Sequence, residues 1–345
     1  MRRRIRKSAA ARAVICAALL ALAFAAVRAD PARAGETLAQ LLLLSPEMPE
    51  TAAESAVILP GRAEPDTAAE SPPPHEPEEE TAPAAPPAAQ ADGADVTLPE
   101  AYVPELTNHT QYKAWSTGPD LTDVPALRMD GTAEVLIVHT HSSEAFTADG
   151  EDPYLPSDGM RTLDTKYNVV RLGDELAERL TQAGIGVVHD REINDYPSYS
   201  GSYSQMRKRI EGYLEKYPSI RIVLDVHRDA ILDAKGENLA LRAQVGGEDT
   251  ARLMFVVGTD EGGLQHPDWR KNLSFAAALQ AWGDTLYPGL MRPIDLRRER
   301  FNQHATAGSL IVEVGSAGNT LAEARRGMAC FAEILLRTLG AEKSG

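Results

Sequence analysis

The chain has 345 residues, a formal net charge of -15 at pH 7 and 43% hydrophobic residues. This length leaves room for about one or two folded domains. The acidic balance argues against nucleic acid as a partner, because the densest basic runs are only the first seven residues and Arg297-Arg298-Glu299-Arg300. With only two cysteines, Cys16 and Cys330, no disulfide framework is available.

The N-terminal segment predicts export. A basic start, Met1-Arg-Arg-Arg-Ile-Arg-Lys7, precedes an apolar run over residues 13–27, and Ala32-Arg-Ala34 resembles a signal-peptide cleavage site. The apolar run is shorter than the ~20 residues that usually span a bilayer, but an Ala-rich run between arginines can still act as an anchor. We therefore expect residues 1–34 to be a signal peptide or a membrane anchor, and both alternatives stay open. In either case the bulk of the protein crosses the membrane.

The composition of residues 35–97 predicts an extended tether. They begin with a leucine-rich juxtamembrane stretch at residues 38–44 and continue into a segment rich in Pro, Ala and Glu. Such a composition cannot bury a core, so we expect a disordered, extended linker. Apolar residues return at Val96, and a catalytic domain is expected over residues 98–345.

Strand and helix patterns alternate through the rest of the chain. Strands are predicted at residues 135–138, 185–188, 221–229, 253–257 and 309–315, and helices at residues 167–180, 203–217, 271–286 and from a cap at Asn319 to about Leu339. This alternation predicts a three-layer α/β/α domain with a mostly parallel central sheet.

Polar residues occur at the ends of three predicted strands. His141 and Glu144 follow the first strand, His227 ends the third, and Glu313 lies within the last. The carboxyl ends of parallel strands meet at one sheet edge, where polar side chains are costly to bury unless something satisfies them. Two imidazoles and a carboxylate suit a catalytic Zn²⁺, and Glu313 would then serve as general base.

Simpler explanations exist for each of these residues. A single histidine at a strand end is more often a hydrogen-bonded edge residue, and a glutamate within a strand can belong to a buried ion pair. His139 is the alternative to His141, because residues two apart on an extended chain share a face. Asp164, in the loop before the first helix, is the alternative to Glu144.

Several separated motifs resemble the stage II sporulation protein P family. They are Thr140-His-Ser-Ser-Glu144, Tyr167-Asn-Val-Val-Arg-Leu-Gly-Asp-Glu-Leu176, Asp225-Val-His-Arg-Asp229, Phe301-Asn-Gln303 and Leu310-Ile-Val-Glu-Val-Gly315. The resemblance covers about residues 101–339, and the first 100 residues match only in layout. It implies an exported, membrane-tethered peptidoglycan hydrolase whose fold is similar to that of the zinc N-acetylmuramoyl-L-alanine amidases.

The resemblance also implies a metal centre and a catalytic residue. His141 and His227 would be zinc ligands, Glu144 the third ligand and Glu313 the catalytic acid and base. The related amidases take their third ligand from near the start of the first helix, so Asp164 stays an alternative.

Further residues would belong to the substrate groove. Arg228 would help to stabilise the oxyanion, and Asn302 and Gln303 would line the groove or support it, together with Arg300. His304 departs from the family pattern, which has an acidic residue after Asn-Gln, and this puts the role of that loop in doubt.

The implied reaction is hydrolysis of the amide between the lactyl group of N-acetylmuramic acid and L-alanine, in septal wall remodelling and engulfment during sporulation. The protein would face the cell wall, anchored to the membrane or secreted if the signal is cleaved. Its expected partners are peptidoglycan, the membrane, a sporulation transglycosylase and a membrane scaffold protein. The alternatives are a zinc carboxypeptidase or endopeptidase acting on stem peptides, with Arg228 or Arg300 taking a terminal carboxylate, and a non-catalytic wall-binding module.

Overall fold

The computed structural model describes residues 96–99, 101–116, 118–150, 154–157 and 159–341. The chain divides into two units, and all of these residues belong to the second, Pro77–Gly345. The predicted signal or anchor and almost all of the predicted linker therefore lie outside the described residues. Among the residues that are described, no helix has the length and apolar character to cross a bilayer.

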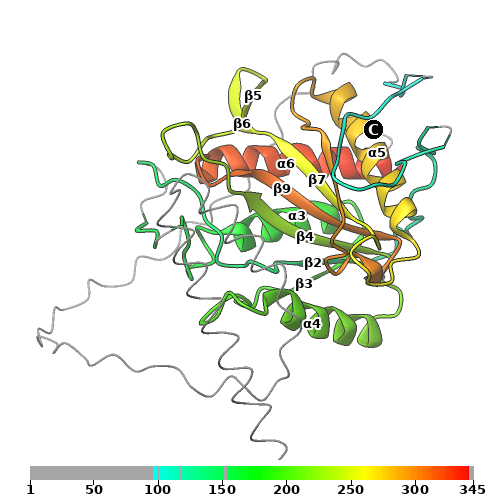
Figure 1. Cartoon of the computed structure of the whole chain (residues 1–345), viewed down its shortest axis with the longest axis horizontal. Helices are drawn as coiled ribbons and strands as arrows, with labels where there is room; N and C mark the ends of the chain where they lie inside the picture. The colour runs from blue at the N-terminus through cyan, green and yellow to red at the C-terminus, as the bar shows by residue number, and fades with distance from the viewer. Residues whose placement is uncertain (1–95, 100, 117, 151–153, 158, 342–345) are drawn as a thin grey trace, which may run out of the picture. The chain divides into compact units, whose positions relative to one another are not determined.

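The described residues form a seven-stranded sheet with the strand order β1-β8-β7-β9-β4-β2-β3 (Figure 1). Its strands are β1 (Leu106–Asn108), β2 (Ala133–Val138), β3 (Gly186–His189), β4 (Ile222–Asp229), β7 (Leu253–Gly258), β8 (Ile294–Arg297) and β9 (Gly308–Ser316). Neighbouring strands run parallel, except that β7 and β9 pair antiparallel. The prediction of a mostly parallel sheet is confirmed.

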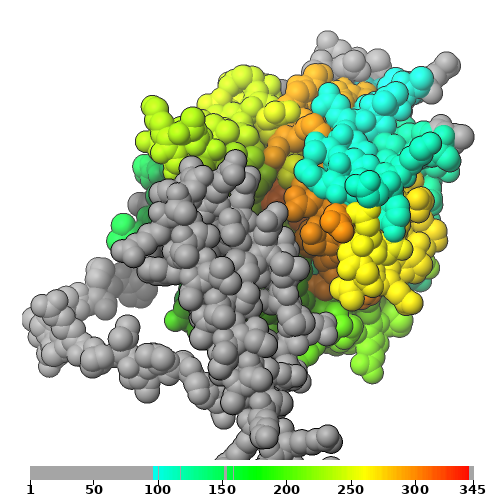
Figure 2. Space-filling model, viewed as in Figure 1, coloured from blue at the N-terminus to red at the C-terminus, as the bar shows by residue number. Residues whose placement is uncertain are grey.

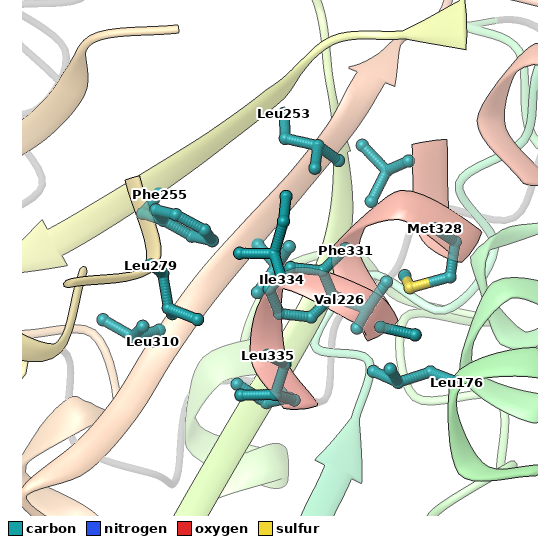
Figure 3. Close-up of a cluster of buried hydrophobic side chains, with 14 of the residues drawn as sticks. Leu176, Val226, Leu253, Phe255, Leu279, Leu310, Met328, Phe331, Ile334 and Leu335 are labelled. Carbon is teal, nitrogen blue, oxygen red and sulfur yellow. The ribbon is translucent and has the colours of Figure 1, made fainter. Parts of the chain in front are cut away.

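Helices cover both faces of this sheet. They are α3 (Val169–Gln182), α5 (Trp269–Leu286) and α6 (Leu321–Thr338) on one face and α4 (Ser202–Lys216) on the other. Figure 3 shows Phe331 and Leu335 of α6 gathered with Val226 of β4 in the larger core. On the opposite face, Met206 of α4 packs against Val223 of β4. The predicted three-layer α/β/α arrangement is therefore confirmed.

Strand β4 shows how the sequence makes the two faces different. Ile222, Leu224 and Val226 are buried in the larger core. Asp225 and His227 alternate with them and must project to the other face, because successive residues of a strand point to opposite sides. The α4 face of the sheet therefore becomes polar towards the carboxyl end of β4.

The short strands were not predicted. Strands β1 and β8 have 3 and 4 residues, and the separate hairpin of β5 (Arg242–Val245) and β6 (Glu248–Ala251) has strands of 4 residues each. Such short segments show too little alternation to be distinguished from loops. Because β1 pairs with β8, it ties the segment before β2 to the edge of the sheet, and Figure 2 shows this cyan segment beside the orange part of the chain.

The cap of helix α6 lies one residue later than predicted. Thr320 is the N-cap, and its side chain accepts a hydrogen bond from Glu323 N while the Glu323 carboxylate accepts one from Thr320 N. The Asn319 carboxamide oxygen instead accepts from Ser316 N and Leu241 N, both at 2.9 Å. Asn319 therefore joins the end of β9 to the segment before β5, a long-range contact that local capping rules do not reveal.

Gly173 of α3 leaves room for the rings of His139, which is buried, and His189, which is half-buried. A Cβ atom there would lie 2.4 Å from His189 Nε2 and 2.6 Å from His139 Nε2. These two nitrogens are hydrogen-bonded to each other at 2.9 Å, so neither ring can move aside without loss of that bond. We expect Gly173→Ala to lower the free energy of unfolding by about 1–3 kcal/mol, as overpacked cores do, in urea denaturation of the full chain.

Gly212 of α4 is the matched control. A Cβ atom at Gly212 would meet nothing within 4 Å. Gly212→Ala should therefore raise the free energy of unfolding by about 0.5–1 kcal/mol, because alanine restricts the unfolded chain more than glycine does. If both substitutions stabilised the protein equally, the packing of the His139 and His189 rings would not depend on the space at Gly173.

Candidate functional site

His141, Glu144 and His227 lie together at the carboxyl edge of the sheet, on the face that carries α4. His227 belongs to the end of β4, and the other two lie in the turn that follows β2. His227 Nδ1 is 3.4 Å from Glu144 Oε2, and the rings of His141 and His227 are 5.4 Å apart and nearly perpendicular. The three residues are only 7%, 5% and 3% exposed, in chain order. The structure thus brings together the three residues predicted as metal ligands.

Asp225 holds the turn after β2 against β4. Its carboxylate accepts hydrogen bonds from Thr140 N at 2.7 Å and Thr140 Oγ1 at 2.5 Å. The same carboxylate lies 2.9 Å from His227 Nε2. One buried carboxylate thereby fixes both the start of the turn and one side of the His227 ring.

The charges at this position favour a cation. Burial lowers the pKa of His227, but the carboxylates of Asp225 and Glu144 on its two sides raise that pKa well above its ordinary value. Burial opposes the ionisation of Glu144, yet the hydrogen bond and charge of His227 lower the Glu144 pKa to about 2. A metal ion that displaced the His227 proton would meet the same pair of carboxylates.

Glu313 is the one residue of β9 that is not fully buried. The sheet register pairs it with His227 of β4, so both side chains project from the same face. Glu313 lines a cavity of about 390 Å³, and its Oε2 has no hydrogen-bond partner. Burial raises the pKa of Glu313 to about 8, opposed by His227 and reinforced by Glu144 and Asp229. A carboxyl group in this state can both accept and return a proton near neutral pH.

The donor set is suitable for Zn²⁺, although its side chains do not yet converge. Two imidazoles and one carboxylate are typical of catalytic zinc sites, and His141 Nδ1 is buried without a hydrogen-bond partner. Within the described ranges, no three His, Cys, Asp or Glu side chains are already grouped around one ion position. Binding an ion at His141, Glu144 and His227 therefore requires these side chains to reorient.

The two alternative ligands lie elsewhere. His139 is fully buried, and its ring nitrogens contact Val226 O at 3.0 Å and His189 Nε2 at 2.9 Å. Burial lowers the pKa of His139 to about 3, so the ring is neutral. Asp164 is exposed, and its carboxylate accepts a hydrogen bond from Lys166 N. Both residues thus serve local structure outside the histidine and carboxylate group.

Arg228 follows His227 near the end of β4 and contacts the loop after β2. Its Nε donates to Ala145 O at 2.9 Å, its Nη2 donates to two further carbonyl oxygens, and its backbone N donates to Glu144. The guanidinium therefore secures the loop that carries Glu144. Arg228 Nη1 also lies 3.9 Å from Glu144 Oε1, and the role predicted for Arg228 at an oxyanion stays a prediction.

The side chains of Asn302 and Gln303 hold the segment before β9 against β7 and α4. The Gln303 carboxamide accepts from Gly258 N and donates to Val256 O of β7, both at 2.7 Å. Asn302 Nδ2 donates to Tyr203 O of α4 at 3.0 Å. Their side chains connect the short helix η1 (Gln303–Ala305) to β7 and α4, and the roles predicted for them at the substrate groove stay predictions.

Arg300 and His304 lie outside the lining of the cavity at Glu313. Arg300 Nη1 donates to Gln265 O at 3.1 Å. Burial lowers the pKa of His304, and the charge of Arg300 lowers it further. The substrate-binding role predicted for Arg300 stays a prediction.

Sequence reasoning missed Asp195 and Tyr199, which lie between β3 and α4. Asp195 accepts hydrogen bonds from Ser143 N and Oγ and pairs with Arg161 at 2.6 Å. The Tyr199 ring stacks on the His141 ring with centroids 4.2 Å apart. The aromatic pair in Tyr196-Pro-Ser-Tyr199 was the available signal, but a polar loop gives no indication of what it contacts.

These features define a three-layer α/β protein with a histidine and carboxylate site at the carboxyl edge of its sheet. Residues 49–336 match the family model described as Stage II sporulation protein P (SpoIIP), and the chain belongs to this family. Membership supports a peptidoglycan hydrolase as the general class of the protein.

Solved structures with low similarity include three amidases. The N-acetylmuramoyl-L-alanine amidase AmiC2 of Nostoc punctiforme is 16% identical, with 61% of this chain and 99% of that chain covered and a TM-score of 0.35. The CwlD amidase from Clostridioides difficile, in complex with the GerS lipoprotein, is 11% identical, with coverages of 61% and 100% and a TM-score of 0.35. The amidase Ami1 from Mycobacterium smegmatis is 11% identical, with coverages of 62% and 100% and a TM-score of 0.35. No curated protein gives a significant match in sequence.

Proposed function

We propose that the chain is a zinc-dependent N-acetylmuramoyl-L-alanine amidase that releases stem peptides from peptidoglycan. The observation that carries the proposal is the position of Glu313 beside the group of His141, Glu144 and His227. The register pairs Glu313 directly with His227, and Glu313 borders a cavity in which a substrate amide can lie. Membership of the SpoIIP family supports peptidoglycan as the substrate.

His141, Glu144 and His227 would hold the zinc ion, which when bound polarises a carbonyl oxygen and lowers the pKa of water. Glu313 takes the proton from the attacking water and returns it to the nitrogen of the leaving L-alanine. This return is necessary because an unprotonated amide nitrogen is a poor leaving group. Glu313 is placed for both transfers, because it is paired with His227 in the sheet register and lines the cavity.

Asp225 contributes to the site through its contacts with His227 and Thr140. Its contacts with His227 Nε2 and with Thr140 fix a ligand ring and the turn that carries His141. Carboxylates behind histidine ligands orient the ring and raise its basicity. We therefore assign Asp225 as a positioning residue.

The peptidase alternative is less well supported. This alternative needs Arg228 or Arg300 to bind the terminal carboxylate of a stem peptide. In the structure Arg228 secures a backbone loop, and Arg300 donates to Gln265 O. Neither residue lines the cavity at Glu313. A non-catalytic wall-binding module does not explain why His227 and Glu313 are paired in the sheet register.

We further propose where the protein acts. Residues 1–34 would export or anchor it, residues 35–97 would tether the domain, and the substrate would be the septal wall during engulfment. The partners proposed from the family are a transglycosylase and a membrane scaffold protein. The family description supports the sporulation setting.

The test is product analysis with the full chain. The protein is incubated with peptidoglycan, with and without a chelator, and the soluble products are identified by mass spectrometry. We expect free stem peptides that begin at L-alanine, lost on chelation and restored by Zn²⁺. Shortened peptides still attached to muramic acid, or release that persists after chelation, would contradict the proposal.

A further inference from the structure

Two hollows of different chemistry flank the histidine and carboxylate group. The first is the cavity at Glu313, and its wall carries several charged side chains: His109, Asp229, Arg292, Asp295 and Arg297. The second has a volume of about 520 Å³ and lies between the loop after Glu144 and the loop before α4. The first hollow suits a ligand with charged groups.

Exposed apolar side chains gather at the second hollow. Leu155, Leu163, Tyr196 and Tyr199 line it and are 96%, 47%, 62% and 55% exposed. These are four of the nine large hydrophobic residues that are exposed in the described part of the chain. Exposed apolar groups concentrated in one place indicate a binding surface, whereas scattered ones need no explanation.

The second hollow adjoins the candidate active site through Tyr199. Tyr199 stacks on His141 with an interplanar angle of 6°, so the hollow begins at a predicted metal ligand. Arg161 and Asp195 also line it, and their ion pair of 2.6 Å holds the guanidinium 4.7 Å from the Tyr199 ring centre. The hollow therefore combines aromatic surface with a polar pair held in place.

This combination is what a sugar ring requires. Pyranose rings have apolar C–H faces, which pack on aromatic rings, and a hydroxyl rim, which needs polar partners. A neutral sugar gains little from the charged cavity at Glu313, whereas a stem peptide carries carboxylates and an amine. In the amide bond to be cleaved, the carbonyl side belongs to the sugar and the nitrogen side to the peptide.

We propose that the hollow at Tyr196 and Tyr199 is a glycan subsite, which binds the sugar rings on the carbonyl side of the scissile amide. The stem peptide then occupies the charged cavity at Glu313, next to the group that protonates its nitrogen. This inference rests on the proposed amidase function for the direction of the substrate. The hollow itself predicts glycan binding whether or not the amide is cleaved.

The first test measures binding alone, in full-length Glu313→Gln protein, by calorimetry with peptide-free glycan oligosaccharides. We expect Tyr196→Ala in this background to weaken binding about 3- to 10-fold, the effect of losing one aromatic contact. Leu264→Ala is the control, because Leu264 is 56% exposed but lies outside the hollow. No oligosaccharide binding, or equal loss in the two variants, would overturn the glycan subsite.

The second test measures turnover of the wild-type chain on two substrates that share the stem peptide. One carries N-acetylmuramic acid within a glycan strand and the other carries only a lactyl group. We expect a lower KM for the first substrate with similar kcat, and Tyr196→Ala should reduce that difference in KM. Equal KM values in the wild-type protein would overturn the direction proposed for the substrate.

The two tests separate the inference from the proposed function. Oligosaccharide binding that depends on Tyr196, without any release of stem peptides, would refute the amidase and keep the subsite. Release of stem peptides without such binding would keep the amidase and refute the subsite. Circular dichroism of Tyr196→Ala, an exposed position, establishes that the variant is folded.

Discussion

Glu313→Gln is expected to reduce kcat by about 10²- to 10⁴-fold, the usual contribution of a general acid and base. Glutamine has nearly the same shape as the glutamate but cannot take a proton from water. Because Glu313 lies beside the predicted ligand His227 and is not itself a predicted ligand, the variant should bind zinc with the same stoichiometry. Release of stem peptides under saturating substrate, together with the zinc content of the protein, measures both quantities.

The same variant should also change how stability depends on pH in metal-free protein. The pKa of Glu313 rises from 4.5 to about 8 because of burial, so the folded state holds a proton that the unfolded state has released. The free energy of unfolding of the wild-type chain should therefore fall as pH rises from about 4.5 to about 8. Glu313→Gln should lack this component of the fall.

Glu215→Gln is the control for both effects, since Glu215 is an exposed carboxylate on α4. It should keep full turnover and the pH dependence of the wild-type chain. Normal turnover in Glu313→Gln would refute the proposed mechanism. A loss of zinc in that variant would instead place Glu313 among the ligands.

Glu144→Gln is expected to abolish stoichiometric zinc binding, whereas Asp164→Asn should keep it. Glu144 Oε2 lies 3.4 Å from His227 Nδ1, while Asp164 is exposed and bonds to Lys166 N. Loss of a ligand should lower zinc affinity by more than the roughly 10- to 100-fold that loss of an outer partner costs. Competition with a chromophoric chelator measures the affinity, and stem-peptide release should fall in parallel.

The opposite result would identify Asp164 as the third ligand. In that case Asp164→Asn would lose zinc and Glu144→Gln would keep it. Glu144 would then serve only to balance the charge of His227, whose pKa it helps to raise. Retention of zinc in both variants would contradict a three-ligand site that includes either carboxylate.

Much of the fold could be predicted because long buried elements carry a strong local pattern. Helix α3 and strands β4 and β9 appear in the sequence close to their observed bounds. Strands β1 and β8 did not, because they have 3 and 4 residues and become strands only by pairing with each other and with β7. The antiparallel pairing of β7 with β9 likewise depends on the sheet as a whole.

The sequence by itself determined which residue types stand where strands end, because that is a local property of the chain. His141, Glu144, His227 and Glu313 were identified in this way, and their catalytic roles stay predictions. The tertiary structure alone decided the contacts of the neighbouring polar residues. It paired His139 with His189, 50 residues away, and stacked Tyr199 on His141. Arg228 secures a loop whose contacting residues lie 68 to 83 positions earlier in the chain. Local patterns give the direction of a side chain at most, whereas its partners come from distant segments that only the folded sheet brings within reach.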